Sequence, residues 1–173
     1  TVLQYLWINL IMDTLAAIAF GMEPPRPEAM WQPPRNPREP FLTNVMLSNI
    51  LVLGLSFIVL ILLVQSTDIL GLERYRGKVP EEQFQLMNGS LAFNCYIWFS
   101  IFHMFNARSV TAGRSAFANI ARSRSFFLVM AFVIVMQVAL VQFGGAALNT
   151  APLPLPVWIR VILLGASAVV VGE

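Results

Sequence analysis

The chain has 173 residues, of which 57% are hydrophobic and only 12% are charged, and its mean hydropathy is +0.70. Soluble domains carry about 25% charged residues, so this composition excludes a disordered chain and a nucleic-acid-binding protein and argues strongly against a soluble enzyme. The formal net charge of +2 is too small to attract polyanions, and the single cysteine, Cys95, excludes an internal disulfide and a multi-cysteine metal site.

The first apolar segment covers residues 1–22 and carries Asp13 as its only charge. Pro24 and Pro25 end it, because proline has no backbone N–H and restricts the residue before it. The segment starts at once, without the charged leader and cleavage site of a signal peptide. The last apolar segment stops at Glu173 just as it reaches full length, so we interpret the chain as a piece of a larger membrane protein.

Four further apolar segments follow the first one. A helix needs about 20 apolar residues to cross a bilayer, and a spanning segment must satisfy its own backbone hydrogen bonds because the bilayer core holds no water. None of the segments alternates with period two, which argues against barrel strands. We therefore predict an all-α membrane protein, a bundle of five transmembrane helices. The predicted helices cover residues 1–22, 44–64, 86–105, 126–143 and 156–172.

The loops between these helices differ in charge. Seven Lys and Arg residues lie in loops 23–43 and 106–125, against three in loop 65–86. Short cytoplasmic loops collect basic residues, so the first helix is expected to run from the outside to the inside. Loop 23–43 holds seven prolines, which stiffen it as either a rigid spacer or a contact to a cytoplasmic domain.

Asp13 is the one acidic residue inside a predicted span. A charge at the centre of a spanning helix costs about 3 kcal/mol on insertion scales, so it usually faces a cavity, an ion or a partner. Asn9 lies four residues earlier, on the same face of an α-helix. Hard cations such as Ca²⁺ take about six to eight oxygen ligands, so Asn9 and Asp13 form part of a candidate metal site. Alternatively, Asp13 pairs with a basic or polar group of a neighbouring helix and Asn9 makes an interhelical hydrogen bond.

Other polar residues lie inside the predicted spans. Ser100 and His103, with Asn94 farther along, form a polar stripe that either faces a transport cavity or makes interhelical hydrogen bonds, and we favour the second interpretation. Gln137 and Gln142 are interpreted in the same way. Small residues such as Gly54 and Gly165 allow close helix packing.

The run from Leu6 to Ala17, followed by Glu23-Pro24-Pro25, resembles the sixth transmembrane helix of P-type calcium-transporting ATPases. It is most similar to the plasma-membrane, calmodulin-regulated type. The resemblance covers nearly the whole chain, from the sixth helix to most of the tenth. Three more stretches resemble this family in the same order: Arg35-Asn36-Pro37 with Glu39-Pro40-Phe41-Leu42, Phe93-Asn94 with Phe105-Asn106-Ala107-Arg108, and Val141-Gln142-Phe143-Gly144-Gly145.

The resemblance implies that Asn9 and Asp13 bind Ca²⁺, the transported ion, with further ligands from the fourth and fifth helices of the parent pump. Two-calcium pumps of the reticulum type have a threonine and a glutamate where this chain has Met12 and Ser100, so a single Ca²⁺ site is expected. No Asp-Lys-Thr-Gly-Thr phosphorylation motif occurs in the sequence. No catalytic or cofactor-binding residue is therefore expected in this fragment, and ATP and Mg²⁺ would bind other domains of the parent pump.

The expected partners are the lipid bilayer and the remaining helices and cytoplasmic domains of the pump, with no nucleic acid. The expected location is the plasma membrane or a bacterial inner membrane. Two other functions stay open: a non-enzymatic helical membrane scaffold with Asp13 in a structural pair, and a P-type pump for another cation such as Mn²⁺.

Overall fold

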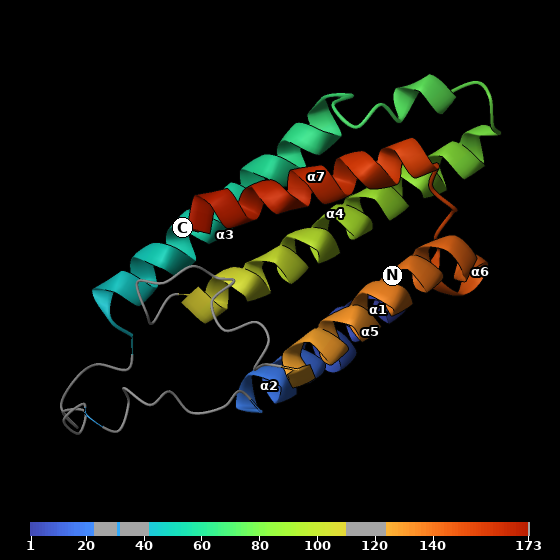
Figure 1. Ribbon diagram of the computed structural model, residues 1–173. Coiled ribbons are helices and arrows are strands. Elements are labelled where there is room, and N and C mark those ends of the chain that lie inside the picture. The colour runs from blue at the N-terminus through green and yellow to red at the C-terminus, as the bar shows by residue number, and fades with distance from the viewer. Residues whose placement is uncertain (23–30, 32–41, 110–123, 173) are drawn as a thin grey trace.

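A computed structural model describes residues 1–22, 31, 42–109 and 124–172 of the chain. The described residues form helices and no β-strand, which confirms the predicted all-α membrane fold (Figure 1). The first helix is continuous but has three labels, because its middle turn is wider than an α-helix. The helices are α1 (Val2–Leu6), η1 (Trp7–Met12), α2 (Asp13–Gly21), α3 (Asn44–Ser66), η3 (Glu73–Tyr75), α4 (Glu81–Ser109), α5 (Arg124–Phe143), α6 (Gly145–Leu148) and α7 (Leu155–Gly172).

Three stretches of the described chain are long and apolar enough to cross a membrane: Val2–Gly21, Met46–Ser66 and Arg124–Phe143. The apolar part of α7, Leu155–Ser167, is shorter. The helix α4 has 29 residues, begins five residues before the predicted 86 and ends four residues after the predicted 105. Hydropathy missed these ends because they are polar.

The early start of α4 has a local physical cause. Glu81 and Glu82 occupy its first turn, where carboxylates interact favourably with the positive end of the helix dipole. The Phe84 amide donates a hydrogen bond of 3.0 Å to the Pro80 carbonyl, which satisfies a backbone group at the helix start. The polar turn therefore extends the helix beyond its apolar part.

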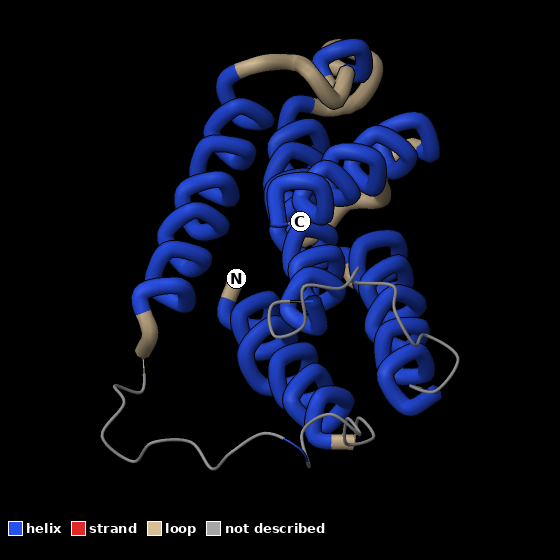
Figure 2. Tube along the Cα trace, turned by 60° about the vertical axis from the view of Figure 1, so that its left-hand side comes forward, coloured by secondary structure: helices blue, strands red, loops and turns tan. Residues whose placement is uncertain are grey.

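The helix α4 contacts α3, α5 and α7 and lies between α7 and α5 in Figure 1. Figure 2 shows the same packed helices from a second direction. The first helix packs against α5 through α2, and α6 contacts both α1 and α5. A Cβ added to Gly165 of α7 would lie only 3.0 Å from Phe102 and 3.1 Å from Trp98 of α4. Gly165 therefore allows the close approach predicted from the sequence. Gly54 of α3 has no comparable neighbour within 4 Å among the described residues.

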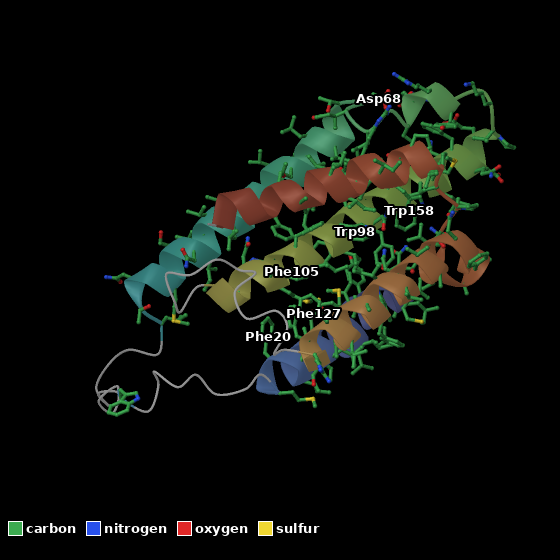
Figure 3. All side chains as sticks on the ribbon, in the orientation of Figure 1. Phe20, Asp68, Trp98, Phe105, Phe127 and Trp158 are labelled. Carbon is green, nitrogen blue, oxygen red and sulfur yellow. The ribbon has the colours of Figure 1, made fainter. Side chains whose placement is uncertain are left out.

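Aromatic rings fill the region where α2, α4 and α5 meet. Phe20 of α2 lies 5.7 Å from Phe126 of α5, and Phe105 of α4 lies 5.4 Å from the same ring, measured between ring centroids. Phe127 also contacts Phe105, so side chains from three helices interlock here (Figure 3). This cluster fixes the end of α2 that follows Asp13.

The helix α3 differs from the others, because most of its apolar side chains are exposed. Val64 is its only buried residue among those described, whereas Ile50, Leu55, Ile58 and Leu62 are each more than half exposed. Such a surface is suited to contact with lipid or with other membrane helices.

Candidate functional site

The first helix changes its hydrogen-bond pattern just before Asp13. The segment η1 is a π-helix, and the backbone amide of Asp13 donates to the carbonyl of Ile8, five residues earlier. In an α-helix this amide would bond to Asn9. The Asp13 amide therefore does not bond to the carbonyl of Asn9. Wide turns of this kind often occur at functional sites.

Asn9 and Asp13 are both exposed on the first helix. The other face of the same helix is buried: Trp7, Ile8, Met12, Ala16 and Ala19 are each less than a tenth exposed. Asn9 and Asp13 make no side-chain hydrogen bond or ion pair with any other described residue. The described part of the chain thus offers Asp13 no basic partner for the structural pair considered above. Their role as metal ligands stays a prediction.

The pair is too small to hold a cation alone. The described residues contain no group of three His, Cys, Asp or Glu side chains that could hold a metal ion. Ca²⁺ takes about six to eight oxygens, so Asn9 and Asp13 can supply only part of its coordination sphere. Met12 is 1% exposed and lies on the buried face, so its thioether does not accompany Asp13.

A buried chain of polar side chains lies behind this turn. The indole Nε1 of Trp7 donates to Oε1 of Gln137 at 3.1 Å. Nε2 of Gln137 in turn donates to Oδ1 of Asn94, also at 3.1 Å. Asn94 and Gln137 are both 0% exposed. The interhelical role predicted for these two residues is confirmed. The two hydrogen bonds join η1, α5 and α4.

The other polar residues of the predicted spans have different partners. Ser100 donates to the Tyr96 carbonyl of its own helix at 3.0 Å, so its interhelical role was wrong. Gln142 binds the backbone of Leu153 in the segment before α7, accepting from its amide at 2.9 Å. The ring of His103 lies edge-on to Phe57 of α3, with centroids 6.3 Å apart.

The N-terminal end of the first helix is also held by a polar contact. Nε2 of Gln4 donates to the carbonyl of Leu148 in α6 at 2.9 Å. The segment after α6 is fixed in turn to α4, because Oγ of Ser90 accepts from the Ala151 amide at 2.9 Å. The half of the first helix before Asn9 is therefore attached, through α6 and the segment after it, to α4 and α5.

Sequence analysis missed Trp7 and the π-helical turn. Gln137 carried a signal, since it is an amide within an apolar run, but its partners depend on how the helices align. A separate groove of about 430 Å³ lies between α3 and α4, and no residue of the first helix lines it. That groove is not part of the Asn9–Asp13 site.

Comparison of the sequence with known proteins identifies its family. A family model described as "Cation transporting ATPase, C-terminus" matches residues 1–173. The calcium-transporting ATPase PAT1 of Dictyostelium discoideum is 36% identical over 180 residues, which cover 99% of this chain and 16% of that protein. The plasma membrane calcium-transporting ATPase mca-1 of Caenorhabditis elegans is 33% identical, over 97% of this chain and 14% of its own length.

A third relative, plasma membrane calcium-transporting ATPase 2 of Oreochromis mossambicus, is 30% identical over 98% of this chain and 15% of its own length. The chain thus spans 14% to 16% of the length of these three relatives. The resemblance inferred from the four sequence motifs is confirmed. The chain belongs to the cation-transporting ATPase family and represents the C-terminal part of its membrane region.

Proposed function

We propose that this chain forms part of the transmembrane ion path of an ATP-driven calcium pump, in which Asn9 and Asp13 are ligands of a single Ca²⁺ site. The observation that carries the proposal is the exposed polar pair on a helix whose opposite face is buried. The names of the relatives, which are calcium-transporting ATPases, support Ca²⁺ as the transported ion.

The chemistry of the pair fits a hard cation. Asp13 supplies a negatively charged carboxylate, and Asn9 supplies a neutral carbonyl oxygen from its amide. Both are oxygen ligands, which Ca²⁺ prefers over the thioether of Met12. The remaining ligands come from helices of the parent pump that are not part of this chain.

ATP and Mg²⁺ bind other domains of the parent pump in this proposal, and this fragment hydrolyses no ATP by itself. Phosphorylation there moves the ion-binding helices relative to one another. The number and geometry of the oxygens around Ca²⁺ then change, and with them the affinity for the ion. Asp13 keeps the ion anchored until its other ligands separate.

The exposed apolar side chains of α3 meet lipid or other pump helices, and the proline-rich loop 23–43 faces the cytoplasm. Residues 23–30 and 32–41 of that loop lie outside the described residues. The relatives named as plasma membrane proteins favour the plasma membrane as the location. A bacterial inner membrane, the other expected location, also has a hydrocarbon core that suits these apolar helices.

The substitution Asp13→Asn in the intact pump tests the ligand role. It keeps the size of the side chain and removes its charge, so it is expected to abolish Ca²⁺-dependent phosphorylation from ATP. The phosphoenzyme formed at micromolar Ca²⁺ is the quantity to measure, and a normal amount would refute Asp13 as a ligand. If instead folding is impaired but the surviving molecules still transport Ca²⁺, Asp13 has a structural role and is not a ligand.

The number of ions bound tests the single site. Met12 is buried and Ser100 is bonded to its own helix, which supports the absence of a second set of ligands in this chain. Equilibrium binding of ⁴⁵Ca to the purified intact pump is expected to saturate near one ion per molecule. Saturation at two ions would contradict the proposal.

A further inference from the structure

The geometry points to Gln137 as a positioning residue for the ion site, which acts by holding Trp7 and the start of the π-helical turn that leads to Asp13. This inference rests on the proposed ligand role of Asn9 and Asp13. Gln137 itself belongs to α5 and faces the buried side of the first helix, so it is not proposed as a ligand of the ion.

Hydrogen-bond chemistry fixes the orientation of the Gln137 amide. The indole N–H of Trp7 can only donate, so the group facing it must be the oxygen of Gln137. The NH₂ group of Gln137 then faces Asn94, whose oxygen accepts from it. Because Gln137 and Asn94 are both 0% exposed, water cannot replace either partner. The three side chains therefore form a single directional chain across three helices.

The first helix is attached to α5 at the start of the wide turn and again after it. Trp7, the first residue of the turn, bonds to Gln137, and the Phe20 ring packs on Phe126 after the turn. These contacts are 13 residues apart on the first helix and 11 residues apart on the antiparallel α5. A π turn takes up an extra residue without a full α-helical rise, which reduces this mismatch.

Release of Trp7 would remove one of these two attachments. The wide turn could then relax to an α-helix, in which the Asp13 amide bonds to Asn9 instead of Ile8. One residue of an α-helix corresponds to a rotation of about 100°. The relaxation would therefore turn the Asn9 side chain relative to that of Asp13. Gln137 thus controls ligand geometry from behind the helix.

The test uses the intact pump with Trp7→Phe, Gln137→Leu and the double variant. The measurement is the Ca²⁺ concentration that gives half-maximal phosphoenzyme, together with the maximal amount of phosphoenzyme per folded molecule. Interhelical hydrogen bonds in membranes correspond to about a 3- to 18-fold change in an equilibrium constant. Each single variant is expected to raise the half-saturating Ca²⁺ concentration by this factor and to leave the maximal amount unchanged.

The double variant separates positioning from general damage. Both single variants break the hydrogen bond between Trp7 and Gln137. The half-saturating Ca²⁺ concentration of the double variant is therefore expected to be no higher than that of the single variant with the larger increase. Effects that multiply would overturn the inference. Trp7→Phe keeps an aromatic ring and removes the N–H, so it tests the bond even if Gln137→Leu does not fold.

Two control variants are available in the same helices. Gln142→Leu removes a glutamine of α5 that binds Leu153 and not the first helix. Cys95→Ala removes buried volume next to Asn94 in α4 and leaves the three hydrogen-bonded side chains intact. Both are expected to keep the Ca²⁺ affinity of the unmodified pump. If Trp7→Phe and Gln137→Leu also keep it, or if the controls shift it equally, the inference is wrong.

Failure of the positioning role of Gln137 can be distinguished from failure of the ligand role of Asp13. If Asp13→Asn abolishes phosphorylation while the Trp7 and Gln137 variants keep normal Ca²⁺ affinity, only the positioning role fails. If Asp13→Asn leaves Ca²⁺-dependent phosphorylation intact, the ligand assignment fails first.

Discussion

Two sets of polar side chains in this membrane region have opposite surroundings. Asn94 and Gln137 are fully buried and bond to each other, and Gln137 also accepts from Trp7. Asn9 and Asp13 are exposed, and no other described residue bonds to their side chains. The first set thus makes hydrogen bonds between helices of this chain, although Nδ2 of Asn94 has no partner among the described residues, whereas the side chains of the second set make none.

The bilayer explains why this difference is informative. A polar group inside a membrane is costly unless it finds a partner, since the hydrocarbon core contains no water. In the buried set the Trp7 indole N–H, both ends of the Gln137 amide and Oδ1 of Asn94 meet this requirement within η1, α5 and α4, and Nδ2 of Asn94 does not. The exposed pair meets it only through an ion, a cavity or another part of the pump. The exposed set is thus suited to binding and the buried set to holding the helices together.

After Asp13→Asn, which removes the charge of the proposed site, the largest expected effect in this comparison comes from Asn9→Ala. The substitution removes one amide oxygen from the proposed site, and we expect the apparent Ca²⁺ affinity of the intact pump to fall at least about tenfold, or about 1.4 kcal/mol. The thermal stability of the pump should change little, because the Asn9 side chain has no bonded partner among the described residues. Phosphoenzyme formation across a Ca²⁺ series measures the first quantity.

Tyr5→Phe is the matched control for Asn9→Ala. Tyr5 is 67% exposed, lies one turn earlier on the same helix, and also loses a polar group. Equal shifts in Ca²⁺ affinity for the two variants would show that the exposed face responds to any polar loss, and would remove the distinction between binding and surface residues.

A smaller effect, on stability, is expected from Asn94→Leu. The substitution leaves the NH₂ group of Gln137 without its acceptor, and bonds of this kind between membrane helices are worth about 0.6 kcal/mol on average and at most about 1.7 kcal/mol. We expect a loss of stability within this range, measured by denaturant unfolding of the purified pump.

Asn88→Leu is the control for this prediction, because Asn88 is an exposed residue of the same helix. It should leave the unfolding free energy nearly unchanged. Should Asn94→Leu be as mild as Asn88→Leu, the buried polar chain would contribute nothing to holding the helices.

The smallest effect concerns a polar pair in a third environment, outside the apolar segments. Glu73 and Arg76 form an ion pair of 2.9 Å, but their side chains are 48% and 56% exposed. Exposed pairs contribute about 0–1 kcal/mol, and salt weakens them further. Glu73→Gln should therefore lower stability by less than about 0.5 kcal/mol in dilute buffer. A larger loss, or one that persists in 1 M salt, would contradict this ranking.

Much of the fold follows from hydropathy. Five apolar segments predicted five helices, and the long helices of the described chain lie at those segments. The ends were less accurate, as at α4, because Glu81 and Glu82 are polar yet favourable at a helix start. Hydropathy detects the part of a helix that fits the bilayer and not the turns that extend beyond it.

The candidate site was predictable only in part. Asp13 was identified because a carboxylate is rare within an apolar span, and Asn9 because of its spacing from Asp13. The wide turn between them was not predictable, since Trp7 to Met12 are all compatible with an ordinary α-helix. Its hydrogen-bond pattern depends on how the first helix aligns with α5.

The sequence by itself determined which segments are apolar and which rare polar residues they carry, because both are properties of composition along the chain. Only the tertiary structure decided that Gln137 bonds to Trp7 and Asn94, while the side chains of Asn9 and Asp13 are exposed. The physical reason is that pairing depends on the rotation and register of packed helices. Residues more than a hundred positions apart, such as Trp7 and Gln137, meet only after that packing is fixed.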